Sequence, residues 1–130
     1  MKLNYDCLRK LLLVLEENIV MQDDLLYPDL RFEEVIPLMP DYSKADIAYT
    51  TSIAIEAELI DARILNADDR FYGCVYFGLT YEGHQFIDNI RNNNVWNKTK
   101  GILSKIGGAS LDMISSTALK LLKSLIEAQL

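Results

Sequence analysis

His84 is the only histidine of the chain and the side chain best suited to acid–base chemistry. Asp88 lies four positions later, where one helical turn would place its carboxylate beside the imidazole ring and fix one tautomer. Catalysis by such a pair needs a third member, and the sequence holds no Gly-x-Ser-x-Gly elbow, phosphate-binding loop or cluster of metal ligands. We therefore expect no catalytic residue, metal or cofactor, and a protein that is not an enzyme.

The cysteines and the acidic pairs have simpler explanations than chemistry. Cys7 and Cys74 stand alone in apolar surroundings and match no metal-binding or redox spacing, so we expect two thiols in the core. Three acidic pairs fall in expected loops or turns, where a solvated surface position is their usual role. These pairs are Asp23-Asp24, Glu33-Glu34 and Asp68-Asp69.

A helix predicted from Ser43 to about Leu59 carries the candidate residues for contact with a macromolecule. Ser43 and Asp46 form a Ser-x-x-Asp start that imitates a capping box. The inward face is modest and comprises Ile47, Ala48, Thr51, Ala54, Ile55 and Leu59. The outward face comprises Asp46, Tyr49, Thr50, Ile53 and Glu56. We take Tyr49, Thr50 and Ile53 as the contact candidates.

Three interpretations of this outward face remain open. A helix that reads DNA normally offers Arg, Lys, Asn or Gln to base edges, and here only Lys44 lies nearby. An exposed aromatic residue and a β-branched aliphatic residue with few charges equally suit the core of a protein interface. In the third interpretation the face packs on residues 18–42 of the same chain.

Basic side chains elsewhere supply the remaining candidates for contact with phosphate. Arg70 follows a turn expected at residues 66–69, and Lys98 and Lys100 lie close to Trp96, which is itself expected to anchor its helix in the core. Residues 1–95 hold eight Lys or Arg against seventeen Asp or Glu, whereas residues 96–130 hold five against two. Contact with a polyanion is therefore better sought in the C-terminal part.

The elements that position these residues are helices around one β-hairpin. An amphipathic helix is predicted after Asn4, up to about residue 17. Residues 18–42 show no persistent period and contain three prolines, so we expect a long connection with one short strand or turn near residues 30–36. Alternating apolar residues predict strands over 60–64 and 71–77 around the turn.

The second half of the chain is predicted to be helical. Thr80 is the expected N-cap of a helix whose apolar stripe begins at Gly83, where a missing side chain lets another backbone approach. The stripe comprises Gly83, Phe86, Ile87 and Ile90, and the run Asn92–Asn94 is expected to end the helix. A helix over 95–106, a Gly107-Gly108 break and a last helix from Ser110 to about Glu127 follow.

The last helix carries a heptad-like seam, so it is predicted to pack on its own domain or on a second copy. The seam comprises Leu111, Ile114, Ala118, Leu121 and Leu125. The protein is accordingly expected to be a monomer or a homodimer that forms through this helix.

The chain contains the run Leu79-Thr80-Tyr81-Glu82-Gly83-His84-Gln85-Phe86-Ile87-Asp88-Asn89-Ile90-Arg91, followed by Val95-Trp96-Asn97-Lys98-Thr99-Lys100. This pattern resembles the signature of a family of small bacterial, phage and prophage proteins known as a domain of unknown function. The resemblance extends from residues 57–62 to the closing helix. It implies a winged helix-turn-helix-like middle portion and a mobile-element context. Where the family usually has His then Leu, this chain has Thr50 and Thr51, and Glu58 replaces the usual Gly at the helix end.

We therefore predict an α+β fold, with a winged-helix-like module over residues 1–94 and two further helices over 95–130 that pack on it or on a second copy. With 130 residues, a net charge of −6 and no apolar run of membrane-spanning or signal-peptide length, a soluble cytoplasmic protein is expected.

The predicted function is that of a small non-enzymatic regulator of phage or mobile-element type that binds DNA through the winged-helix-like module. The alternative is an adaptor that binds a host or phage protein through helix 43–59 or the C-terminal helix and does not bind DNA.

Overall fold

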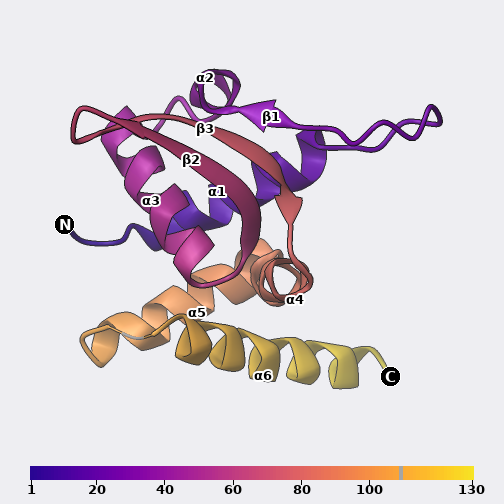
Figure 1. The fold of residues 1–130 in the computed structure, drawn as a ribbon. Coiled ribbons are helices and arrows are strands. Elements are labelled where there is room, and N and C mark those ends of the chain that lie inside the picture. Colours follow the sequence, from indigo (N-terminus) through magenta and orange to yellow (C-terminus); the bar gives the residue numbers. More distant parts are fainter. Residues whose placement is uncertain (109) are drawn as a thin grey trace. The chain divides into compact units, whose positions relative to one another are not determined.

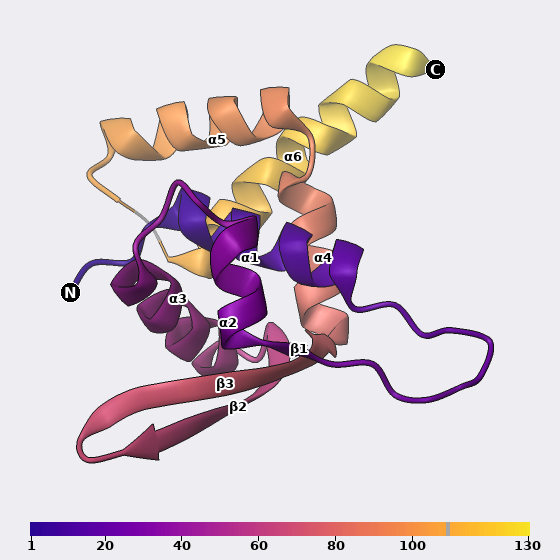
Figure 2. The same cartoon turned by 90° about the horizontal axis from the view of Figure 1, so that it is seen from above.

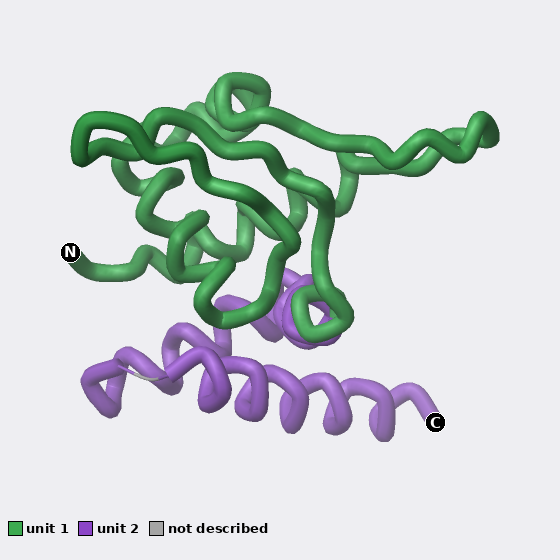
Figure 3. Tube along the Cα trace, in the orientation of Figure 1, with its two compact units in different colours: residues 1–84 green, residues 85–130 purple. Residues whose placement is uncertain are grey.

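The computed structural model describes residues 1–108 and 110–130 and has an α+β fold (Figure 1). Its elements are α1 (Tyr5–Asn18), β1 (Leu30–Arg31), α2 (Phe32–Val35), the 3-10 helix η1 (Ile36–Leu38), α3 (Lys44–Glu56), β2 (Ile60–Ala67), β3 (Arg70–Leu79), α4 (Tyr81–Ile90), α5 (Asn93–Lys105) and α6 (Leu111–Gln129). The chain divides into two compact units, unit 1 over Met1–His84 and unit 2 over Gln85–Leu130 (Figure 3).

Unit 1 is built on an antiparallel sheet of three strands in the order β1-β3-β2. Helices α1 and α3 lie on one face of this sheet and pack on each other (Figure 2). The apolar face of α1 is buried through Cys7, Leu8, Leu11, Leu12, Val14 and Leu15. Asn4 caps this helix by accepting a hydrogen bond of 3.1 Å from the Cys7 N–H, as its position predicts.

The β2–β3 hairpin turns at Asp68 and Asp69, which both have positive φ values, 52° and 59°. Two central residues with positive φ are typical of a type I′ turn, the mirror image of a type I turn. The twist of a type I′ turn matches the twist of the two strands that it joins. The pairing skips Phe77, because Asp61 is opposite Gly78 and Ala62 is opposite Tyr76. It skips Tyr72 in the same way between Phe71 and Gly73. Both skipped residues are therefore β-bulges, which re-aim the side chain of the extra residue.

The buried face of β3 is formed by Cys74 and Tyr76. The Tyr76 hydroxyl lies 2.7 Å from Thr51 Oγ1, and Thr51 Oγ1 donates to the Ile47 carbonyl oxygen at 2.8 Å. Tyr76 is therefore the donor to Thr51, and both buried hydroxyls have partners. Burial raises the pKa of Tyr76, which keeps the hydroxyl protonated. Both thiols, Cys7 and Cys74, are buried as predicted.

The 18–42 segment contains more regular structure than its sequence predicts. The short strand expected near residues 30–36 is β1, but α2 and η1 follow it directly. These helices have four and three residues, so neither is long enough to show a helical period. Their packing still places Val35 and Met39 completely in the core.

The junction of α3 with β2 is joined to the start of α4 by hydrogen bonds of Thr80. Glu58 has φ 59°, the left-handed conformation that usually requires Gly. Thr80 Oγ1 accepts from the Gly83 N–H at 3.0 Å and donates to the Glu58 carbonyl oxygen, while the Thr80 N–H donates to the Leu59 carbonyl oxygen at 3.1 Å. The predicted N-cap at Thr80 is confirmed. All four residues of the predicted stripe are buried, namely Gly83, Phe86, Ile87 and Ile90.

In unit 2, α5 packs on α6. The Asn92–Asn94 run is predicted to end a helix, but Asn93 and Asn94 are the first two residues of α5. Asn92 accepts a hydrogen bond of 3.1 Å from the Val95 N–H and so caps the start of α5. Gly107 and Gly108 have φ values of 83° and 123° and form the predicted break, and α6 begins after Ser110. No helix of the described part of the chain is long and apolar enough to cross a membrane.

Of the seam predicted on α6, two residues are buried, Leu111 and Leu121 are half-buried, and Leu125 is exposed. Ile114 and Ala118 are buried, and the Asn89 amide donates to Ser115 Oγ at 2.8 Å. Leu125 and Ile126, by contrast, are exposed. The end of α6 therefore presents apolar side chains that unit 2 does not cover.

Candidate functional site

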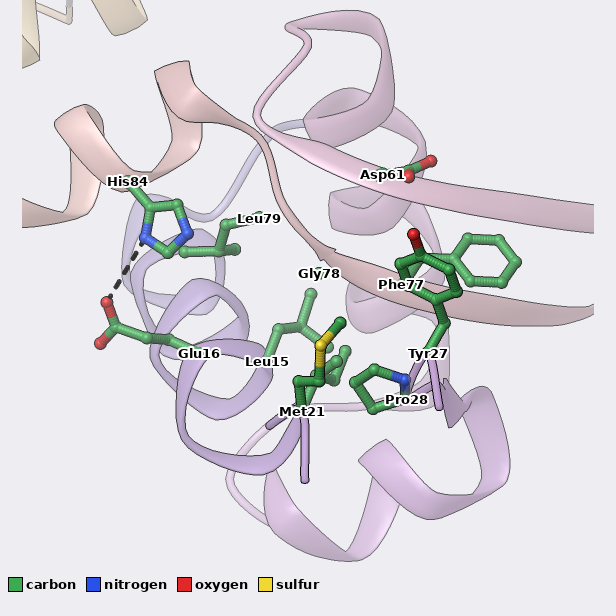
Figure 4. A pocket seen from close by; sticks show the side chains of 11 residues that line it. Leu15, Glu16, Met21, Tyr27, Pro28, Asp61, Phe77, Gly78, Leu79 and His84 are labelled. Atoms are coloured by element: carbon green, nitrogen blue, oxygen red, sulfur yellow. Dashed lines mark ion pairs between the residues drawn. The ribbon is translucent and has the colours of Figure 1, made fainter. Parts of the chain in front are cut away.

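His84 and Asp88 do not form the acid–base pair that their spacing suggests. His84 Nδ1 lies 3.8 Å from Glu16 Oε2, and the imidazole is 54% exposed (Figure 4). Asp88 accepts instead from the Arg91 guanidinium at 2.9 Å. Within residues 1–108 and 110–130, no cluster of three or more His, Cys, Asp or Glu residues is arranged to hold a metal ion.

The contact candidates on α3 are only partly available. Thr50 is 1% exposed, so its predicted outward position is wrong. The reason is that α3 packs on both α1 and β2, which buries a wider arc of the helix than one stripe, and Thr50 forms a hydrogen bond with the buried Cys7 thiol. Burial is also the main reason why the pKa of Cys7 is raised. Tyr49 and Ile53 are half-buried, so each keeps an accessible part.

A groove of about 450 Å³ lies beside α3 and is lined by residues of α2, η1, α3 and β3. Its lining comprises Phe32, Glu33, Ile36, Lys44, Ala45, Ala48, Phe71 and Tyr72. The rings of Phe32 and Phe71 pack against each other with their centroids 4.9 Å apart. The bulge in β3 turns the Tyr72 side chain outward, where it is 74% exposed. We call this surface the α3 groove.

The charges around the α3 groove do not favour a polyanion. Lys44 and Glu33 are its only charged lining residues among those described, and they have opposite signs. Arg70 lies at the hairpin turn beside the exposed Asp68 and Asp69. Unit 1 as a whole holds seven Lys or Arg against sixteen Asp or Glu. A phosphate backbone would therefore meet net repulsion near this face.

The lysines predicted to contact a partner lie on α5, in unit 2. Lys98 is exposed and lines a groove of about 530 Å³ between α5 and α6. Lys100 is half-buried, and its Nζ lies 5.5 Å from the ring centroid of Trp96, a cation–π contact. Trp96 is 3% exposed, as expected of a core anchor. Unit 2 holds six Lys or Arg against three Asp or Glu, the opposite balance to unit 1.

The aromatic residues of the α3 groove are functional candidates that the sequence analysis did not identify. Phe32 lies in a helix of four residues, which has no period to indicate where its side chain points. Tyr72 is a bulge residue, and a bulge depends on pairing between two strands. The only sequence signal is the unusual density of aromatic residues in β3, at positions 71, 72, 76 and 77.

Comparison with known proteins places the chain in a family. An uncharacterized protein of Haemophilus influenzae is 30% identical over 127 residues, which cover 97% of this chain and 99% of the relative. No solved structure matches the chain. The sequence pattern of the hypothetical protein family DUF2513 matches residues 2–110. Because this match covers most of the chain, the protein belongs to the DUF2513 family of hypothetical proteins.

Proposed function

We propose that this protein is a small non-enzymatic regulator of phage or mobile-element type whose winged-helix-like module binds another protein through the α3 groove. The order α1, β1, α2, α3 and β2–β3 hairpin supports the winged-helix-like assignment, with α3 in the place of a recognition helix. The sheet order β1-β3-β2 agrees with a hairpin that forms the wing. The fold alone does not show whether the partner is DNA or a protein, so this choice rests on the composition of the groove.

The composition of the α3 groove is the observation that carries this proposal. Ala45 and Ala48 have short side chains, so α3 leaves space in the groove that it lines. Phe32, Phe71 and Tyr72 supply aromatic surface beside it. Aromatic residues at a surface with few charges are typical of the core of a protein interface. A partner that inserts an apolar side chain here would gain the burial that anchors such interfaces.

DNA binding is the second candidate, and the order of the elements favours it. The charges oppose it, because base reading and phosphate contact need Arg, Lys, Asn or Gln, and Lys44 is the only such side chain among the described residues that line the α3 groove. Tyr49 and Ile53 also lack the bidentate groups that recognise bases. Protein binding is therefore the function that fits this face better.

Capture of a partner from a host lysate, with and without nuclease, tests the proposal. Tyr72→Ser and Ala48→Glu alter the α3 groove, whereas Tyr81→Ser is a matched control because Tyr81 is also exposed, at 72% against 74% for Tyr72. We expect both groove variants to lose a protein partner that the control and the wild type retain, irrespective of nuclease. If nuclease treatment of the lysate abolished the capture, and the protein bound duplex DNA in a salt-dependent way, the DNA alternative would be favoured instead.

A further inference from the structure

A second surface of unit 1 is formed around residues 19–29, which leave α1, extend away from the sheet and return as β1 (Figures 1 and 2). We call this segment the arm. Its shape is defined by local hydrogen bonds, since the Leu25 N–H donates to the Gln22 carbonyl oxygen at 3.0 Å and Asp24 accepts from the Leu26 N–H at 3.1 Å. Five large apolar or aromatic side chains of the arm are exposed, namely Val20, Met21, Leu25, Leu26 and Tyr27. Such a concentration of exposed apolar residues is typical of an interaction site.

A groove of about 680 Å³ lies at the base of the arm. Its lining comes from the end of α1, the arm, the start of β2, the end of β3 and the start of α4. Figure 4 shows Met21, Pro28, Tyr27 and Phe77 gathered on one side of this arm groove. Phe77 is the second bulge residue of β3, and it is 44% exposed. The arm groove is therefore mainly apolar, and two aromatic rings are accessible in it.

The arm groove also borders an open strand edge. β1 pairs with β3 only at Leu30–Tyr76 and Arg31–Val75. If this register continued, Pro28 would lie opposite Gly78, but proline has no N–H to donate to a ladder. Among the described residues, β1 therefore provides no partner for β3 from Phe77 to Leu79. An extended peptide can add main-chain hydrogen bonds at such an edge while its side chains enter the adjacent groove.

The charges of the arm groove are acidic at both ends. Glu16 lies at one end, beside His84, and Asp61 lies at the other (Figure 4). The arm adds the exposed Asp23 and Asp24. The groove lining contains no Lys or Arg among the described residues, and His84 is its only basic side chain. A bound segment with positive charges would therefore be complementary to both ends.

We propose that the arm groove binds an extended segment of another protein, in which an apolar side chain is flanked by Lys or Arg. The apolar side chain would contact Phe77 and Tyr27, and the flanking cations would approach Glu16 and Asp61. The arm of a second copy fits less well, because its own Asp23 and Asp24 would meet these carboxylates. This site is separate from the α3 groove and takes a partner of different chemistry, so it extends the proposed function without depending on it.

Selection of nine-residue peptides from a random display library against the full chain tests this proposal. We expect the enriched peptides to place an apolar residue between Lys or Arg residues. A synthetic peptide of the enriched sequence should bind Phe77→Ser and Asp61→Lys at least tenfold more weakly than the wild type. Asp69→Lys, the same charge change at the hairpin turn, and Tyr72→Ser in the α3 groove should each change the affinity less than twofold. All four variants alter exposed positions, so thermal melting should show that each one is folded.

Several outcomes would overturn the proposal. They are the absence of any enriched peptide, the enrichment of acidic or uncharged sequences, and equal weakening by Asp61→Lys and Asp69→Lys. A peptide that loses affinity in Tyr72→Ser but not in Phe77→Ser would bind the α3 groove instead, which separates this proposal from the proposed function. Self-association of the wild type in light scattering that disappears in Phe77→Ser would assign the arm groove to a second copy.

Discussion

The carbonyl oxygen of Leu59 lies against Gly83, in the space that a β-carbon on Gly83 would occupy. The same carbonyl oxygen accepts the Thr80 N–H, so the backbone on both sides of this contact is fixed by hydrogen bonding. The start of α4 can therefore approach the start of β2 only because residue 83 has no side chain. This confirms the close approach that the position of Gly83 in the apolar stripe predicts.

Gly83→Ala is expected to destabilise the protein, because the new methyl group would overlap the Leu59 carbonyl group rather than a flexible side chain. Overpacking of this kind costs about 1 to 3 kcal/mol. Gly101→Ala is the control, since Gly101 lies within α5 and a β-carbon there would meet nothing within 4 Å. That change should stabilise by up to about 1 kcal/mol through helix propensity. Urea denaturation of both variants measures the difference, and similar free energies of unfolding would contradict the prediction.

Glu58→Gly is expected to stabilise the protein. Glu58 has φ 59°, and a non-glycine residue in this conformation is disfavoured by about 1 to 2 kcal/mol. The gain should be about 1 kcal/mol, because glycine also increases the entropy of the unfolded chain. Glu56→Gly is the control, since Glu56 is the last residue of α3 and glycine there lowers helix propensity. Thermal melting should move upward for position 58 and downward for position 56, and a downward shift at both would refute the strain at Glu58.

Stability is expected to fall at alkaline pH because of Cys74. Burial raises the pKa of this thiol from its ordinary 9.0 to about 11. The folded pKa is then above the unfolded one, so the contribution of the thiol to stability is complete below pH 9.0 and is lost as the pH rises to about 11. Cys74→Ala should lower the free energy of unfolding at neutral pH but flatten its decline over this range. If the stability of the variant declined as steeply as that of the wild type, the loss of stability at alkaline pH would come from other groups. Tyr76 is one such group, because burial also raises its pKa.

The first half of α6 is expected to stabilise the protein more than its end. Ile114 is 2% exposed and Ile126 is 59% exposed. Ile114→Ala should cost about 2 to 5 kcal/mol by removing buried methyl groups, and Ile126→Ala should stay within about 0.5 kcal/mol. Truncation after Gly108 removes both, so the truncated chain should melt at a lower temperature or become insoluble. An unchanged melting temperature and an unchanged mass by light scattering would show that α6 neither completes a core nor joins two copies.

Any association with random duplex DNA at low salt is expected to depend on the lysines of α5. Replacing Lys98, Lys100 and Lys105 by Gln should weaken it and reduce its salt dependence, because fewer counterions are released. A triple Lys→Gln variant at Lys2, Lys10 and Lys44 is the control, since these lysines belong to the acidic unit 1. Fluorescence anisotropy at several salt concentrations compares the two. Equal affinities would remove α5 as the phosphate-contacting surface.

The sequence by itself determined the long helices, the presence of the hairpin and four of the helix starts. Asn4, Ser43, Thr80 and Ser110 each accept a hydrogen bond from the N–H three residues later. Such a bond depends on the residue type and on a few neighbouring positions, so local sequence is sufficient to predict it. The apolar stripe that begins at Gly83 could be predicted for the same reason, because helical periodicity is local.

Only the tertiary structure decided which surfaces are available to a partner. Thr50 is buried although Tyr49 is partly accessible, because α3 is covered from two directions by α1 and the sheet. Tyr72 and Phe77 are exposed because their strand pairs with β2 in a register that skips them. The position of a bulge depends on the pairing of two strands, and a groove depends on how several elements pack, so no local period in the sequence records either of them. The two grooves of unit 1 are therefore properties of the folded arrangement of strands and helices.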